Sequence, residues 1–176
     1  MEARSLSRLV EAVLAGAWRR QSAYHGEEHW RCVASTGLAL SHTLDGVDRG
    51  LVLCFGLLHD TRRENESIDP GHGPRAAAFA AELRAEGFLE LDEARFRLLE
   101  EALRLHSDGH VSGDPTIGAC WDADRLHLPR VLIEPDPARF STTAALGPEP
   151  LTAATTLREQ GAPGWPALIA AATARG

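Results

Sequence analysis

Long hydrophobic runs are missing from this chain. The apolar segment Leu51 to Leu58 is far shorter than the roughly 20 residues needed to cross a bilayer, and charged residues follow it. The first residues, Met1 to Ser5, lead into an amphipathic pattern, whereas a signal peptide would continue into an apolar core with a small-residue cleavage site. We therefore expect neither a membrane partner nor a signal peptide.

Cysteine is scarce and is not arranged in pairs. Cys32, Cys54 and Cys120 each stand alone within an apolar stretch, and the sequence has no CxxC motif. This pattern excludes a disulfide framework and gives no thiolate metal site. We therefore expect the protein to work in a reducing cytoplasm.

An excess of positive charge is also missing. The chain has 18 basic against 25 acidic residues, so its formal net charge is -7. General affinity for nucleic acid requires many Lys and Arg side chains to neutralise phosphates, so we expect no nucleic acid polymer as a partner. A small phosphorylated substrate needs only a few local arginines and stays open as a ligand class. The sequence gives no indication of oligomeric state.

Strand-like alternation of apolar and polar residues is scarce, and the apolar residues recur at helical spacing instead. The run from Leu51 to Leu58 alone could be a buried strand or a buried helix, and its helical neighbours favour a helix. The length of 176 residues and the hydrophobic content of 44% suit one compact domain. We therefore predict an all-α helical bundle that forms a single domain over residues 1–176. The other predicted helices cover about residues 3–18, 27–44, 75–86, 92–106, 115–128, 151–160 and 164–174.

The composition changes beyond Pro129, where further prolines space the chain. We expect this segment to wrap around the surface before the two short C-terminal helices. The motif-bearing core would then cover about residues 24–140, and the tail beyond Pro129 would carry no evident chemistry.

The pair His59-Asp60 closes the apolar run and is the strongest chemical signal in the chain. A hydrated carboxylate rarely ends such a segment without a partner, and a metal ion is a suitable one. His29, His106 and Asp124 each lie on the apolar face of a predicted helix. A single inward histidine is more often a hydrogen-bonded core residue, and Asp124 alone could pair with an arginine. Their joint occurrence favours a shared metal, because burying all of them otherwise requires several independent hydrogen-bond partners.

The order of these motifs resembles the HD superfamily of metal-dependent phosphohydrolases. The segment His29-Trp30-Arg31-Cys32-Val33 is similar to its H-x-x-x-V motif, and Ala123-Asp124-Arg125-Leu126-His127 is similar to the A-D-R-L-H segment of alarmone hydrolases. Small bacterial HD proteins have the order H, HD, H-G or H-A, H-S or H-T, and then D-A-D-R-L. That order is similar to His29, His59-Asp60, His72-Gly73, His106-Ser107 and Asp122 to Leu126. The resemblance covers about residues 24–140 and implies an all-helical HD-domain bundle.

The resemblance also implies roles for single residues. It implies that His29, His59, Asp60 and Asp124 bind one metal ion, and that His72 and His106 bind a second metal or contact the substrate phosphate. The GYP signature of the branch that acts on cyclic dinucleotides does not follow His106, so such a substrate is disfavoured. His127 lies off the predicted inner face of its helix, and we assign it no ligand role.

Two imidazoles and two carboxylates suit Mn²⁺, Fe²⁺, Co²⁺, Ni²⁺ or Zn²⁺. Such an ion would lower the pKa of bound water and polarise a phosphorus centre, while arginines stabilise the charge on the phosphate. We expect Asp60, Arg63 and His106 to act in catalysis, and Arg62 and Arg125 to be further phosphate contacts.

Three other polar residues have two interpretations each. His25 precedes Gly26 and the predicted helix, so it is either a proton donor or phosphate contact at the mouth of the site or a capping residue. Glu64 and Asp69 either orient the attacking water or belong to a solvated loop. His42 and His110 are expected to be ordinary surface residues.

The predicted function is hydrolysis of a small phosphate ester or anhydride, with a nucleotide as the foremost substrate. Two alternatives stay open. His72 and His106 would also suit a di-iron oxygenase on the same scaffold, and the third alternative is a noncatalytic module that binds a metal or a nucleotide.

Overall fold

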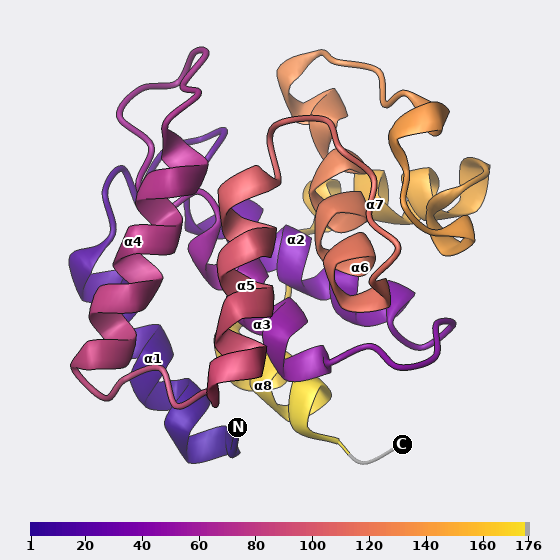
Figure 1. Cartoon of the computed structure of the whole chain (residues 1–176). Coiled ribbons are helices and arrows are strands. Elements are labelled where there is room, and N and C mark those ends of the chain that lie inside the picture. The colour runs from indigo at the N-terminus through magenta and orange to yellow at the C-terminus, as the bar shows by residue number, and fades with distance from the viewer. Residues whose placement is uncertain (175–176) are drawn as a thin grey trace.

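The computed structural model describes residues 1–174, and this part of the chain contains helices and no strands. The predicted all-α fold is therefore confirmed. Its α-helices are α1 (Ala3–Gly16), α2 (Glu27–Leu40), α3 (Arg49–Leu58), α4 (His72–Ala85), α5 (Glu93–Leu105), α6 (Pro115–Arg125), α7 (Pro148–Gln160) and α8 (Trp165–Thr173). Three short 3-10 helices, η1 (Leu128–Val131), η2 (Pro137–Arg139) and η3 (Thr143–Ala145), connect α6 to α7 (Figure 1).

Helix α3 lies at the centre of the bundle. All its residues from Leu51 to Leu58 are buried, and it packs against α1, α2, α5, α6 and α8. A helix surrounded on all sides needs no polar face, which explains the unbroken apolar run. Asp48 begins the helix by accepting a hydrogen bond from the backbone N–H of Leu51.

Helices α2 and α3 approach each other closely at two glycines. A Cβ atom on Gly56 would lie 2.7 Å from backbone atoms of Ala34, and one on Gly37 would lie 2.6 Å from Val52 Cγ1. No larger residue fits at either position without a shift of the helices. This contact fixes the two helices as an antiparallel pair, with the start of α2 beside the end of α3.

Several helix boundaries differ from the prediction, including the end of α6 at Arg125 instead of residue 128 and the start of α7 at Pro148 instead of residue 151. Helix α2 ends at Leu40 instead of residue 44, because the hydroxyls of Ser41 and Thr43 bond back to the carbonyls of Leu38 and Leu40 and compete with a further helical turn. Helix α4 begins at His72 and so includes His72 and Gly73, which the prediction placed in the break before the helix. Pro74 lies within its first turn, as predicted, where a proline is tolerated.

The segment that follows α6 is anchored to the bundle by a buried carboxylate. Asp122 is fully buried on α6 and accepts hydrogen bonds from the backbone N–H groups of Ser141 and Thr142 and from the Thr142 hydroxyl. After α7, the final helix α8 packs against α1 and α3. Within residues 1–174, no helix combines the length and apolar character needed to cross a membrane.

Candidate metal centre and its cavity

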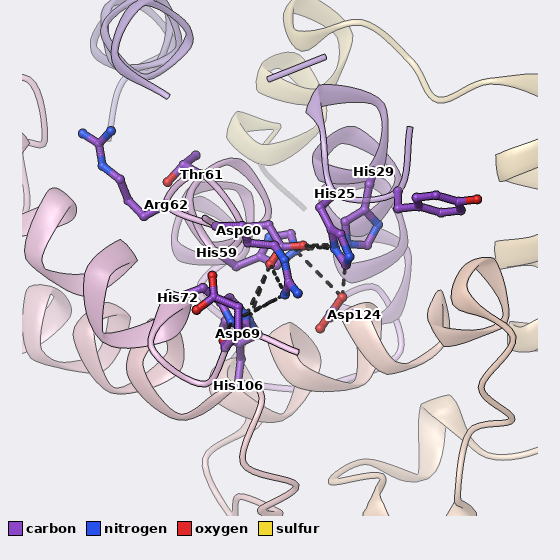
Figure 2. Close-up of polar contacts among 12 residues, drawn as sticks. His25, His29, His59, Asp60, Thr61, Arg62, Asp69, His72, His106 and Asp124 are labelled. Carbon is purple, nitrogen blue, oxygen red and sulfur yellow. Dashed lines mark hydrogen bonds and ion pairs between the residues drawn. The ribbon is translucent and has the colours of Figure 1, made fainter. Parts of the chain in front are cut away.

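Two antiparallel helix pairs each bring two histidines together. In the pair α2 and α3, His29 lies in the first turn of α2 and His59 directly follows α3. In the pair α4 and α5, His72 opens α4 and His106 directly follows α5. The same arrangement thus occurs twice, and Figure 2 shows all four imidazoles converging on one region beside Asp60 and Asp124.

The first group consists of His29, His59 and Asp124. The Nε2 atoms of His29 and His59 lie 3.2 Å apart, and Asp124 Oδ1 lies 3.3 Å from His29 Nε2 and 3.8 Å from His59 Nε2. Three donor atoms this close together can bind one metal ion.

The second group consists of Asp60, His72 and His106. The Nε2 atoms of His72 and His106 lie 2.8 Å apart, and Asp60 Oδ1 lies 3.3 Å and 4.0 Å from them, respectively. This group can also bind a metal ion. The sequence prediction placed Asp60 with His29, His59 and Asp124, whereas its Oδ1 atom meets the other two histidines.

Asp60 lies between the two groups. While Oδ1 faces His72 and His106, Oδ2 lies 3.6 Å from His29 Nε2 and 3.7 Å from His59 Nε2 (Figure 2). A carboxylate with one oxygen toward each group can bridge two metal ions, as carboxylates do in two-metal sites.

The hydrogen bonds of the imidazoles fit a metal better than a purely structural role. The Nδ1 atoms of His59 and His106 donate to the carbonyls of Gly56 and Leu103, 3.0 Å and 2.8 Å away, and His72 Nδ1 donates to the Asp69 carbonyl. A neutral ring that donates from Nδ1 has only a lone pair on Nε2. Within the second group, two such lone pairs therefore face each other, which is unfavourable unless a cation lies between them.

An unpartnered carboxylate oxygen supports the same conclusion for the first group. Within residues 1–174, Asp124 Oδ1 is buried and has no hydrogen-bond partner. A buried polar atom without a partner costs free energy, and a metal at Oδ1 would remove that cost.

The charge states also suit metal binding at neutral pH. Burial lowers the pKa of His29, of His72 and of His106, and neighbouring cationic groups lower it further. Burial would raise the pKa of Asp60 and of Asp124, but the surrounding imidazoles hold both values well below the usual range. His29, His72 and His106 are therefore neutral and Asp60 and Asp124 are ionised, which are the forms that bind metals.

A cavity of about 710 Å³ opens above the two groups. Asp60, His72, His106 and Asp124 line its floor. Its walls come from residues within the loop 66–70, the turn 107–109 and the segment 125–139 that contains η1 and η2, at one end of the bundle, at the top of Figure 1. The volume is within the range of pockets that enclose small organic ligands.

The three predicted arginines lie in different surroundings. Arg63 lines the cavity, with its Nη1 atom 3.6 Å from Asp60 Oδ1. Arg62 points away from the cluster (Figure 2), stacks over Phe79 and donates to the Gly16 carbonyl, so it is not placed to contact a phosphate. Arg125 reaches the cavity wall, but its guanidinium donates to the carbonyls of Arg139 and His110 and stabilises the wrapping segment.

His25 lies at the site, as its interpretation as a proton donor or phosphate contact requires. Its Nδ1 atom is 3.0 Å from Asp60 Oδ2, and because an ionised carboxylate only accepts, the imidazole donates this bond. It lines the cavity next to Asp60. Its carbonyl accepts a bond from Trp30 Nε1, which holds the loop before α2 in place.

Glu64 does not line the cavity and is largely exposed. Asp69 lines it, but both carboxylate oxygens accept hydrogen bonds from Arg75 Nη2. These contacts favour a structural role for Asp69. His42 and His110 are exposed, as expected.

Arg130 belongs to the site, although the sequence prediction found no chemistry in the segment after Pro129. Its guanidinium lies 3.8 Å from Asp60 Oδ2 and 3.8 Å from Asp124 Oδ1. Bonds to the carbonyls of Tyr24 and His127 fix its direction. The change of composition at Pro129 was the only signal, because it marks the turn η1 that brings the chain back over the cavity.

His127 is buried, which corrects the prediction that it lies off the inner face of its helix. Its Nε2 atom lies 2.9 Å from the hydroxyl of Thr36. It follows the end of α6, where the chain leaves the helical path on which the prediction was based. It contributes to neither metal-binding group.

We expect His127 to make the folded state sensitive to acid. Burial, assisted by Arg130, lowers the pKa of His127 to about 4. In the unfolded chain, His127 takes up a proton near pH 6.5. The stability that the neutral, buried His127 contributes to the folded state is therefore present above that pH and is lost as the pH falls toward 4. In metal-free protein, the free energy of unfolding measured with urea should fall between roughly pH 7.5 and pH 4.5. This fall should be smaller in His127→Gln than in the unmodified protein, by roughly 2 to 3 kcal/mol. Parallel pH profiles of the two proteins would contradict this assignment.

Comparisons with family models, curated proteins and solved structures give no match to this chain. The resemblance to the HD superfamily therefore stays a prediction that depends on the quoted motifs. The metal-binding geometry stands independently of it.

Proposed function

We propose that this protein is a metal-dependent phosphohydrolase of the HD type. Its substrate would be a small phosphate ester or anhydride, with a nucleotide foremost. The observation that carries the proposal is the position of Asp60 between two buried histidine pairs, with Arg63 and Arg130 on opposite sides of the same carboxylate. A divalent metal bound here would supply an activated water and polarise the phosphorus centre.

The protein side chains have separate tasks in this proposal. Arg63 and Arg130 are each held by two backbone carbonyls, with the remaining N–H groups toward the metal-binding groups. Guanidinium groups fixed in this way bind phosphate oxygens without further ordering cost. His25 bonds to Asp60 and is placed to exchange a proton with a ligand in the cavity.

A di-iron oxygenase is the second candidate, and the two adjacent metal-binding groups that share Asp60 favour it. The two arginines beside Asp60 favour phosphate chemistry instead, because oxygen activation does not require a pair of arginines that bind an anion. A noncatalytic metal-binding module is the third interpretation.

Elemental analysis of protein purified without chelators, followed by phosphate release from a panel of nucleotides and other phosphate esters, tests the proposal. Metal together with metal-dependent phosphate release is the expected result. An iron-loaded protein that changes its electronic absorption in air and releases no phosphate would indicate the oxygenase. Absence of both activities would indicate the binding module.

We expect His106→Gln to fold and to lose at least roughly 10²-fold in phosphate release. His106 is buried next to His72 and Asp60, and a glutamine retains polar atoms but removes the Nε2 lone pair. The matched control is His42→Gln, because His42 is exposed, its ring lies beside Arg49, and it does not line the cavity. Equal activity of the two variants on a confirmed substrate would mean that His106 is structural.

A further inference from the structure

The cavity has a second region that differs chemically from its floor. We propose that it binds the organic part of a phosphomonoester, and that this part is bulky and apolar, such as an aromatic ring. The inference rests on the proposed function and adds the class of leaving group.

The outer wall of the cavity exposes aliphatic side chains. Ile68 is 89% exposed and Ile133 is 52% exposed, although both line the same cavity as the metal-binding residues. Leu128 and Val131 continue this lining toward Arg130. Exposed aliphatic side chains around a pocket become favourable when an apolar ligand covers them.

Ile68 and Ile133 belong to different segments of the chain. Ile68 lies between α3 and α4, and Ile133 follows η1, so the two meet at one cavity only through the tertiary structure. A ligand that reaches from the metal-binding groups toward the mouth would therefore have aliphatic contacts on two walls.

The charges of the cavity complement a ligand with one anionic end. Arg63 and Arg130 lie at the floor. Two acidic residues of the wall are already paired, since Glu66 bonds to Arg19 and Asp69 to Arg75. The lining also contains Asp108, Glu134 and Asp136, so the wall has no excess of positive charge for a second anionic group and suits a neutral body better.

The volume of the cavity is consistent with a polar floor for the phosphate and an aliphatic wall for the organic part. The cavity of about 710 Å³ is much larger than a phosphate requires and lies within the range that encloses drug-sized ligands. In the reaction, the oxygen of water forms a bond to phosphorus while the bond from phosphorus to the ester oxygen breaks. The products are inorganic phosphate and an alcohol or phenol, whose oxygen takes up one proton of the water.

Binding of two phosphonates to metal-loaded protein, measured by calorimetry, tests the inference without turnover. Phenylphosphonate should bind at least roughly tenfold more tightly than methylphosphonate, because the ring covers the aliphatic wall. Ile68→Ser and Ile133→Ser should each reduce this ratio several-fold. Leu132→Ser is the matched control, since Leu132 is 97% exposed and adjacent to Ile133 but does not line the cavity.

Phosphate release from phenyl phosphate and methyl phosphate separates this inference from the proposed function. Equal binding of both phosphonates, or unchanged ratios in the isoleucine variants, would overturn the inference even if both esters are hydrolysed. Selective binding of phenylphosphonate without hydrolysis of any ester would support the apolar region and contradict the phosphohydrolase proposal. Because the substituted side chains are exposed, equal melting temperatures should verify that all variants fold.

Discussion

Asp60→Asn is expected to lower the metal content of both groups and to reduce phosphate release by roughly 10²-fold to 10³-fold or more. The substitution keeps the shape of the side chain but removes its charge. Asp60 directs one oxygen toward His72 and the other toward His29, so no other residue can replace it in both places. Elemental analysis and phosphate release measure the two effects.

The control for this prediction is Asp69→Asn. Asp69 lines the same cavity, but its carboxylate is bonded to Arg75, so this variant should keep its metal. Full metal occupancy in folded Asp60→Asn would show that Asp60 is not a ligand of either group.

Removing the metal is expected to lower the melting temperature by roughly 10 °C. A ligand that binds only the folded state at a thousand times its dissociation constant adds about 4 kcal/mol, and for a chain of this size each kcal/mol shifts the melting temperature by about 2 to 4 °C. The physical reason is clearest in the second group, where the Nε2 lone pairs of His72 and His106 face each other, with the two atoms 2.8 Å apart, and need a cation between them.

Thermal unfolding with and without a chelator, with metal removal verified by elemental analysis, measures this shift. Asp124→Ala, which removes a ligand of the first group, should show a smaller response to the chelator than the unmodified protein. An unchanged melting curve after complete metal removal would contradict a role of the metal in stability.

The helices could be predicted because their signals are local. Apolar residues at helical spacing mark the buried face of α1 at Leu6, Leu9, Val10 and Val13, and Asp114 with Pro115 marks the start of α6. The ends were less certain. Helix α2 ends early because Ser41 and Thr43 compete for its last carbonyls, an effect that periodicity does not show.

The histidines of the site could be predicted for the same reason. His29 lies on the buried face of its helix, and His59 and His106 directly follow buried helical faces, so packing the bundle turns them inward. The sequence could not predict which ligand atoms lie close together. The division of the ligands into two groups depends on the rotamer of Asp60, and a side-chain rotamer is set by contacts between helices.

The sequence by itself determined an all-helical chain, because apolar residues recur at the period of the helix. It also placed His29, His59, Asp60 and His106 inside the fold, but it missed the burial of His127. Only the tertiary structure decided that Arg130 reaches the site while Arg62 turns toward Phe79. It also brought Ile68 and Ile133 to one cavity. These residues lie outside regular helices, where no repeat fixes the direction of a side chain, so their positions depend on contacts with segments distant in the sequence.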